Sequence, residues 1–220
     1  YRRVFHEEMA QNKAAGLSVA LVDGERIVWC EGFGYYNAEY KSRVTGKTPF
    51  LIGSIAKTFT GLAVMKLREQ RRVDLDKPLR AYVPRFGMKT HFGSLDAVTV
   101  RTLMTHHGGV PDFIRDKFMA SQPPFSKVLD YVNDDYATFP PNTVFSYSNA
   151  GVSLLGMVVE TVAGKSYYNY LREHILEPIG MREAGFFSGY NAPESVWLGY
   201  DGEGNERREL PVVDAPAGCI

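Results

Sequence analysis

The sequence predicts a mixed α/β fold in which an antiparallel sheet flanked by helices adjoins an all-helical subdomain. Two β-rich runs, residues 17–22 and 26–30, surround Asp23-Gly24, a dipeptide typical of hairpin turns. From residue 50 to residue 176, apolar residues recur at helical spacing, and proline and glycine separate the runs. The hairpin predicts the sheet, and the periodic stretches predict the helices.

The composition is that of a globular chain without a charged binding surface. Of the 220 residues, 45% are hydrophobic and 13% are aromatic, which is enough to bury a core. The 25 basic and 25 acidic side chains balance, so we expect no nucleic-acid partner. No apolar run is long enough to span a membrane. Cys30 and Cys219 lack metal-ligand spacing; two unrelated thiols are favoured, and a disulfide stays open.

Two helices are predicted in the first half of the chain, one on each side of the hairpin. Residues 1–15 are charged with apolar positions at helical spacing, which indicates an N-terminal helix. Residues 32–47 are rich in glycine, tyrosine and polar residues, and are predicted to be a strand end and a loop. The second helix begins near Ser54 and runs to Arg71.

The second half is predicted to be mainly helical. Its helices are expected over residues 100–106, 126–136, 149–163 and 167–176. Thr99 and Ser166 are good N-caps for the first and last of these, and Gly164 ends the long one. Residues 139–143 are predicted to be extended, because a residue before proline avoids the helical conformation. Residues 196–213 are predicted to form two strands.

These elements indicate three segments. Residues 1–70 would hold the N-terminal helix, the first hairpin and the helix that carries Ser54. Residues 71–185 would form the helical subdomain, which carries the Tyr147-Ser148-Asn149 loop. Residues 186–220 would return to the α/β part.

Ser54 and Lys57 are the first candidate site residues. Residues three apart share one face of a helix, so the amine would lie beside the hydroxyl. A serine hydroxyl becomes a good nucleophile only when a neighbouring base takes its proton. Burial penalises the ammonium form, so Lys57 could be that base if apolar neighbours such as Ile55 and Leu62 enclosed it. The alternative is a helix-capping Ser54 with a solvated Lys57.

Tyr147 and Asn149 are the candidates for the other half of the site. They lie between a stiff Pro-Pro-Asn segment and a long apolar helix. A tyrosine hydroxyl can pass a proton to a leaving group, and an asparagine amide can donate to a substrate carbonyl. The Tyr-x-Asn pattern recurs elsewhere in the chain, but only this match has a rigid loop setting.

Other polar motifs have simpler interpretations. His106 is expected to satisfy backbone carbonyls at a helix end, since it and His107 point to different faces and make a poor metal pair. Asp112 could line the mouth of the site, although a role in a turn is favoured. Gly46-Lys47-Thr48 and Gly164-Lys165-Ser166 lack the upstream glycine of a phosphate loop. We therefore expect no metal or nucleotide cofactor.

Several stretches together resemble the serine β-lactamase and penicillin-binding-protein superfamily, in the branch of class C β-lactamases, D-Ala-D-Ala carboxypeptidases and related esterases. They include Ser54-x-x-Lys57 and Tyr147-Ser148-Asn149. The full set is residues 50–60, 75–79, 99–106, 109–111, 147–151, 177–181 and 215–218, in the order found in the family. The resemblance implies a β-lactamase/transpeptidase-like fold.

The resemblance also implies a role for each candidate residue. Ser54 would be acylated, Lys57 would accept its proton, Tyr147 would relay the proton, and Asn149 would bind the substrate carbonyl. The family's third motif, Lys-Thr-Gly or His-x-Gly, does not follow Gly218 in this sequence. The chain is therefore expected to be the front portion of a longer polypeptide, whose remaining part is a candidate partner.

The predicted function is that of a serine hydrolase that forms an acyl-enzyme at Ser54 with a peptide, ester or β-lactam carbonyl. Peptides and esters are favoured over β-lactams as the natural substrate. The alternative is a non-catalytic or slowly acylated protein of the same fold that binds cell-wall peptide or a protein partner. The intact set of candidate residues argues against that alternative. A periplasmic or extracellular location is expected, and a cytoplasmic one stays open.

Overall fold

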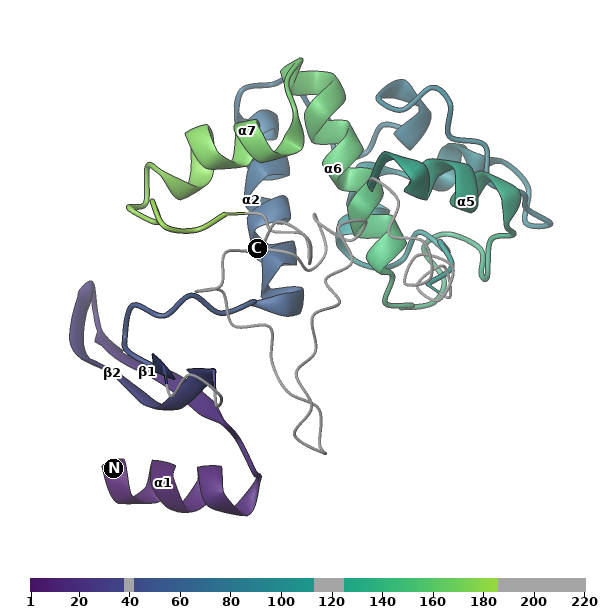
Figure 1. Cartoon of the computed structure of the whole chain (residues 1–220). Helices are drawn as coiled ribbons and strands as arrows, with labels where there is room; N and C mark the ends of the chain where they lie inside the picture. Colours follow the sequence, from purple (N-terminus) through teal and green to yellow (C-terminus); the bar gives the residue numbers. More distant parts are fainter. Residues whose placement is uncertain (38–41, 113–124, 186–220) are drawn as a thin grey trace. The chain divides into compact units, whose positions relative to one another are not determined.

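The structure, a computed structural model, describes residues 1–37, 42–112 and 125–185 (Figure 1). These residues belong to two compact units, of which the first is Tyr1–Leu51 and the second begins at Ile52. The segment boundaries predicted at residues 70 and 185 stay predictions. The two strands predicted over 196–213, and Cys219, lie outside the described residues.

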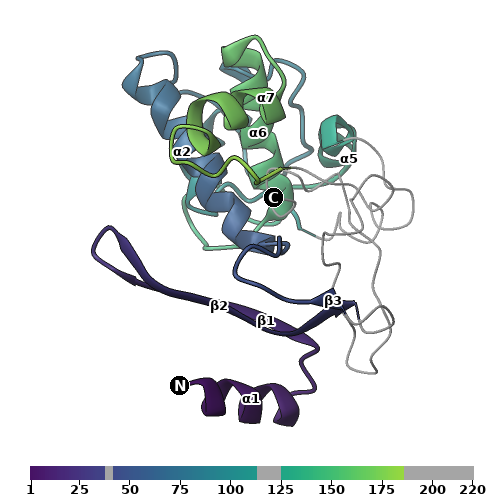
Figure 2. The ribbon, with the colours of Figure 1, turned by 60° about the vertical axis from the view of Figure 1, so that its left-hand side comes forward.

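The first unit consists of a helix and a three-stranded antiparallel sheet. Helix α1 spans Arg2–Gln11, and strand β1 (Gly16–Asp23) pairs with β2 (Arg26–Asn37). The short strand β3 (Ser42–Arg43) pairs with β2, which lies in the middle of the sheet (Figure 2). Gly24 occupies the β1–β2 turn with a φ of +58°, a conformation that glycine adopts readily. The predicted N-terminal helix and hairpin are confirmed.

Strand β2 is longer than predicted, because residues 32–37 continue the strand instead of starting a loop. A Cβ atom at Gly32 would collide with the backbone of Val44 and Thr45, so only glycine fits where that segment crosses the strand. The glycine here marks a close approach of two backbone segments, which composition alone does not distinguish from a loop.

The second unit is a cluster of helices around α6. Its helices are α2 (Ala56–Glu69), α3 (Val100–Met104), α5 (Val128–Asp134), α6 (Asn149–Ala163) and α7 (Tyr167–Leu171). Short 3-10 turns occupy Gly53–Ile55, Leu79–Ala81, Leu95–Ala97 and Phe125–Lys127. Helix α6 packs against α2, α3, α5 and α7, and Figures 1 and 2 both show α2 beside it. Neighbours on several sides account for the apolar character of α6 over most of its surface.

The helix boundaries follow capping residues that the sequence contains. Thr99 caps α3 through a capping box, although α3 ends at Met104, earlier than predicted. Gly164 ends α6 with a φ of +71°, as predicted. Ser166 caps α7, after which residues Arg172–Leu176 continue as a π-helical turn.

The extended stretch predicted over residues 139–143 is wrong in its second half. Residues 141–143 form a turn, and Asn142 has a φ of +66°. Proline restricts only the residue before it, and asparagine tolerates the left-handed conformation better than most residues. Nothing in the Pro-Pro pair therefore keeps Asn142 extended.

Candidate active site

Three side chains singled out from the sequence meet at one oxygen atom. The Ser54 Oγ accepts a hydrogen bond from Lys57 Nζ at 3.1 Å and another from the Tyr147 hydroxyl at 2.8 Å. The Lys57 Nζ also lies 4.8 Å from the centroid of the Tyr147 ring. Ser54 and Lys57 come from the start of α2, whereas Tyr147 comes from the loop before α6. The structure thus brings these three residues together, and their catalytic roles stay predictions.

The backbone before α2 presents Ser54 to solvent. Gly53 has a φ of +53°, in the left-handed region that favours glycine, and Ser54 follows it in the 3-10 turn Gly53–Ile55. Ser54 is exposed, and Lys57 lies three residues later, in the first turn of α2. The hydroxyl is therefore accessible, while its position relative to the amine is set by helix geometry.

The apolar enclosure predicted for Lys57 is only partial. Lys57 is half-buried, and two residues of the predicted apolar wall, Ile55 and Leu62, are 62% and 48% exposed. The residues that α2 buries are Ala56, Thr60, Ala63, Val64 and Leu67. A helix buries one face against its neighbours, and Lys57 lies at the border of that face. The structure therefore supports Lys57 as a base through the closeness of its amine to the Ser54 hydroxyl more than through burial of the amine.

Asn149 is the first residue of α6, and Asp112 holds it in two ways. One carboxylate oxygen of Asp112 accepts a hydrogen bond from the Asn149 backbone N–H at 2.5 Å. The other accepts from the side-chain Nδ2 of Asn149 at 3.2 Å. Asp112 therefore binds a candidate site residue, and the turn role favoured for it stays a prediction, because residues 113–124 lie outside the described residues. An amide carries two N–H donors, so Asn149 keeps the capacity to donate to a substrate carbonyl.

His106 contacts the same loop. Its Nδ1 accepts a hydrogen bond from the Ser148 backbone N–H at 3.2 Å, and its ring centroid lies 4.6 Å from that of Tyr147. The expectation that His106 satisfies a helix-end carbonyl is wrong, because its Nδ1 acts as an acceptor. The neighbouring His107 makes that type of contact, with its Nδ1 2.6 Å from the Thr105 carbonyl oxygen. Burial, followed by the charge of Lys57, lowers the pKa of His106 below its usual value.

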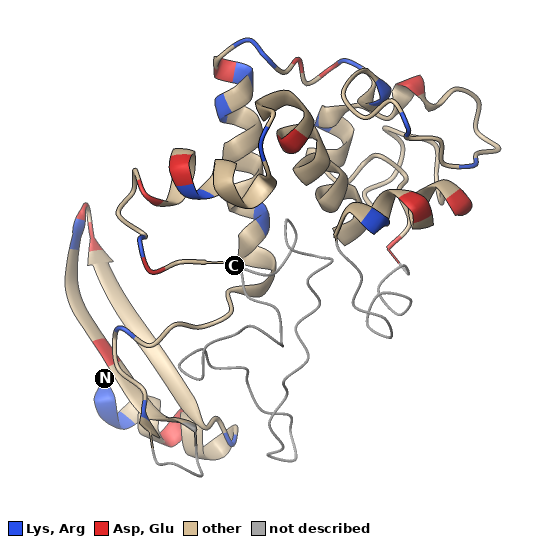
Figure 3. Ribbon diagram, turned by 45° about the horizontal axis from the view of Figure 1, so that its top comes forward, with Lys and Arg blue, Asp and Glu red and all other residues tan. Residues whose placement is uncertain are grey.

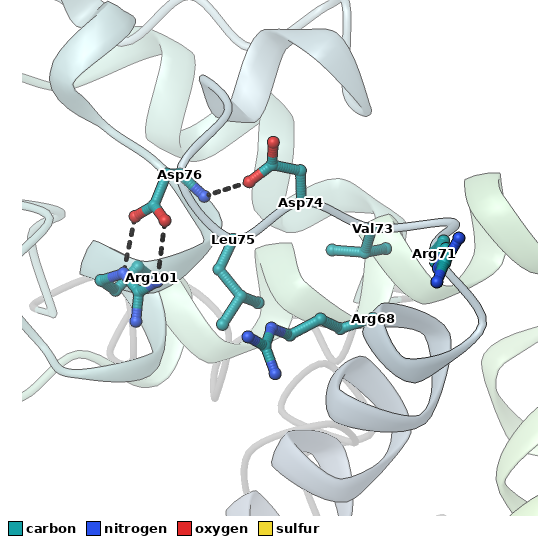
Figure 4. A pocket seen from close by; sticks show the side chains of 7 residues that line it. All are labelled: Arg68, Arg71, Val73, Asp74, Leu75, Asp76 and Arg101. Atoms are coloured by element: carbon teal, nitrogen blue, oxygen red, sulfur yellow. Dashed lines mark hydrogen bonds and ion pairs between the residues drawn. The ribbon is translucent and has the colours of Figure 1, made fainter.

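A separate pocket of about 290 Å³ lies at the other end of α2 (Figure 4). Its lining consists of Arg68, Arg71, Val73, Asp74, Leu75, Asp76 and Arg101. Arg101 donates two hydrogen bonds to the Asp76 carboxylate, at 2.6 and 2.8 Å, and the Asp76 N–H donates to Asp74. None of these described lining residues is a serine, cysteine or histidine, so this pocket lacks a nucleophile for acyl transfer.

The charges and donor groups of the described residues add no second site. Along the ribbon that Figure 3 colours, basic and acidic residues are interspersed on the helices and loops. Within residues 1–37, 42–112 and 125–185, no group of three His, Cys, Asp or Glu residues could hold a metal ion. The helices of this part of the chain are all too short or too polar to cross a membrane.

Comparison with known proteins connects the whole chain to one family. The model of the family described as Beta-lactamase matches residues 1–218. Protein flp of Staphylococcus aureus (strain MW2) is 26% identical over 215 residues, which cover 97% of this chain and 42% of that protein. The chain therefore spans less than half the length of this curated relative.

Solved structures agree with the sequence comparison. The octameric penicillin-binding protein homologue from Pyrococcus abyssi has a TM-score of 0.86 and 32% identity, covering 99% of this chain and 51% of that one. The D-amino acid amidase from Ochrobactrum anthropi SV3 has a TM-score of 0.81 and 26% identity, covering 98% of this chain and 63% of that one. The class C β-lactamase from Rhodobacter sphaeroides has a TM-score of 0.75 and 25% identity, covering 99% and 60%. Because the family model matches nearly the entire sequence, the chain belongs to the β-lactamase family and has the β-lactamase-like fold.

Proposed function

We propose that this protein is a serine hydrolase that forms an acyl-enzyme at Ser54. The observation that carries the proposal is the double hydrogen bonding of one oxygen: Ser54 Oγ lies within 3.1 Å of Lys57 Nζ and 2.8 Å of the Tyr147 hydroxyl. A nucleophile with two proton-transfer partners within hydrogen-bond distance is the arrangement that covalent acyl transfer needs. A capping serine and a solvated lysine would need neither contact.

In the proposed reaction, Ser54 Oγ attacks the substrate carbonyl while the amine of Lys57 takes the hydroxyl proton. A C–Oγ bond forms, and the carbonyl oxygen becomes an oxyanion. When the intermediate collapses, the bond to the leaving group breaks, Tyr147 passes its hydroxyl proton to the leaving atom, and the proton held by Lys57 moves to Tyr147. Water then attacks the acyl-enzyme, the C–Oγ bond breaks, and a proton returns to Ser54. Each proton transfer of this type contributes about 10²–10⁴-fold to the rate.

Asn149 and the Ser54 backbone N–H complete the proposed set. Asn149 would donate its second amide N–H to the substrate, while Asp112 holds the first. The Ser54 N–H lies in the first turn before α2, where helix N–H groups point outward and favour an oxyanion. One such donor is worth about 2.7–4 kcal/mol of transition-state stabilisation in comparable sites.

We propose an amide or ester of a peptide or small molecule as the substrate, ahead of a β-lactam. The amidase and the class C β-lactamase that resemble this chain are hydrolases of different carbonyl compounds, at similar identities. Specificity among such carbonyls depends on the pocket beside the serine and on the rate at which water reaches the acyl-enzyme.

The test is intact-mass analysis of the protein after incubation with a β-lactam, together with hydrolysis of a p-nitrophenyl ester. We expect an adduct on Ser54 or ester turnover, and neither with Ser54→Ala. A stable adduct would indicate a penicillin-binding type of site, and rapid β-lactam turnover would indicate a β-lactamase. Failure of both reactions in the folded wild-type protein would overturn the proposal and favour a binding protein of the same fold.

A further inference from the structure

Residues 106–112, called here the bracing segment, lie along the loop that leads to Tyr147. The Ser146 N–H donates to the His106 carbonyl at 2.8 Å, and the Asn142 N–H donates to the His107 carbonyl at 2.9 Å. Further back, the Thr138 N–H donates to the Gly109 carbonyl at 2.9 Å. Main-chain hydrogen bonds therefore tie the loop to the bracing segment at three points before the candidate site residues begin.

Gly109 allows this close approach. It has a φ of +68°, and a Cβ atom there would collide with the Phe139 carbonyl oxygen. Only glycine fits at this point of the bracing segment. The side chains at the two ends of the bracing segment, His106 and Asp112, then reach the two residues that follow Tyr147.

The two side chains bind consecutive backbone N–H groups. His106 Nδ1 accepts from Ser148, and Asp112 accepts from Asn149 as well as from the Asn149 amide. The His106 ring also packs against Tyr147, at a centroid distance of 4.6 Å with 33° between the ring planes. Together, His106 and Asp112 fix the backbone between Tyr147 and Asn149. They also fix the ring of Tyr147 and the side-chain amide of Asn149.

The His106 contact depends on its protonation state. An imidazole nitrogen accepts a hydrogen bond only when it carries no proton, so Nδ1 must be bare and Nε2 must hold the proton. Protonation would place an N–H donor against the Ser148 N–H and add a cation beside Lys57. The bond to Ser148 would then be lost.

We propose that His106 and Asp112 are positioning residues for Tyr147 and Asn149, and that His106 acts only while its imidazole is neutral. This inference rests on the proposed function, because it concerns the same site. Neither residue needs to touch the substrate: each acts through the loop. A catalytic group displaced by about 1 Å can lose about 10²-fold in rate.

The charged and titratable groups around His106 favour the neutral form on balance. Burial has the largest effect, and the Lys57 ammonium and His107 also lower the pKa of His106, whereas Asp112 raises it. Tyr147 faces the ring through stacking. We therefore expect His106 to be neutral at pH 8 and to become protonated only at a pH below the usual pKa of histidine.

The kinetic test measures the acylation rate between pH 5 and 9 for three variants and the wild type. His106→Asn keeps an acceptor near the position of Nδ1, tolerates the φ of +58° at this residue and cannot be protonated. We expect it to react nearly like wild type at pH 8 and to lose less activity on acidification. His106→Gly also tolerates that φ but has no acceptor, and we expect a loss of about 10²-fold at every pH. His107→Asn, the matched control, should keep the wild-type profile.

The second test does not depend on activity. In the Ser54→Ala protein, NMR of the histidine ring nitrogens should show the Nε2–H tautomer for His106, and the Ser148 amide shift should follow its titration. If the NMR prediction holds and no probe acylates the wild-type protein, the proposed function fails while the bracing contact stands. A Nδ1–H tautomer, a Ser148 shift independent of His106, or identical pH profiles for wild type and His106→Asn would each overturn the inference.

Discussion

The two ends of helix α2 both carry polar side chains, but they differ in what those side chains can do. At the start, Lys57 and Tyr147 converge on the single hydroxyl oxygen of Ser54. At the other end, Arg101 and Asp76 neutralise each other through two hydrogen bonds in an open pocket (Figure 4). The pocket is a measurable hollow, yet none of its described lining residues is a nucleophile for acyl transfer. A measurable cavity is therefore a weaker sign of catalysis here than the convergence of proton-transfer groups on one atom.

The largest expected effect comes from removing the amine at the start of α2. Lys57→Met should lower the acylation rate by about 10⁴-fold, because it removes the proposed base that takes the Ser54 proton as the bond forms. The matched control is Arg68→Met, which removes a cation at the other end of the same helix. Stopped-flow acylation kinetics should show Arg68→Met near the wild-type rate. Equal losses of acylation rate in the two variants would contradict the functional distinction between the two ends of α2.

The next effect concerns the phenol that closes the site. Tyr147→Phe should lower the rate by about 10²–10³-fold, because it removes the hydroxyl bonded to Ser54 Oγ but keeps the ring that packs on His106. Tyr82→Phe is the control, since the Tyr82 hydroxyl accepts a hydrogen bond from the Asp74 N–H at the pocket end of α2. Steady-state kinetics should separate the two. An unaffected Tyr147→Phe would remove Tyr147 from the proposed proton relay.

A smaller effect is expected on stability, from the core side of α2 between its two ends. Thr60 Oγ1 and the Tyr167 hydroxyl share a buried hydrogen bond of 2.8 Å. Tyr167→Phe should lower the free energy of unfolding by about 1–2 kcal/mol, because it takes a partner from a buried hydroxyl. Tyr170→Phe offers a matched comparison on α7, since among the described residues the buried Tyr170 hydroxyl has no hydrogen-bond partner. Denaturant unfolding should show Tyr170→Phe neutral or slightly stabilising; destabilisation of both would contradict this account.

The smallest effect is expected at the pocket. The Arg101 guanidinium lowers the pKa of Asp76 below its usual value. A lowered carboxylate pKa contributes stability above the unfolded-state value, and the contribution is lost as the pH falls through the folded-state value. Asp76→Asn should therefore lower Tm at pH 7 and lower it less at pH 2, and the effect should be small because the pair is exposed. Thermal unfolding of the variant and the wild type at the two pH values checks this prediction. A Tm difference between them that grows in acid would contradict it.

Local signals account for the elements that were predicted well. Helix α6 spans Asn149–Ala163 as expected, because Ser148 caps its start and Gly164 ends it in the left-handed conformation. The hairpin follows from Asp23-Gly24 in the same way. Signals of this kind act within one turn of the chain, so they can be read without the rest of the fold.

The predictions for residues 32–37 and for His106 failed because they depended on contacts between distant segments. Gly32 lies in a strand because it pairs with Ser18 of β1, and Asp112 binds Asn149, 37 residues away. His106 and its Ser148 partner are 42 residues apart. No local pattern distinguishes a turn aspartate from one that holds a distant amide. The predicted location and the third family motif stay predictions.

The sequence by itself determined that a hydroxyl and an amine lie beside each other, because a helix places residues three apart on one face whatever surrounds it. Only the tertiary structure decided that Tyr147 reaches the same oxygen from 93 residues away. It also decided that Lys57 lies at the border of a buried face and not within it. The physical reason is that helix spacing is a property of the local backbone, whereas burial and long-range contacts depend on how α6 and its loop pack against α2.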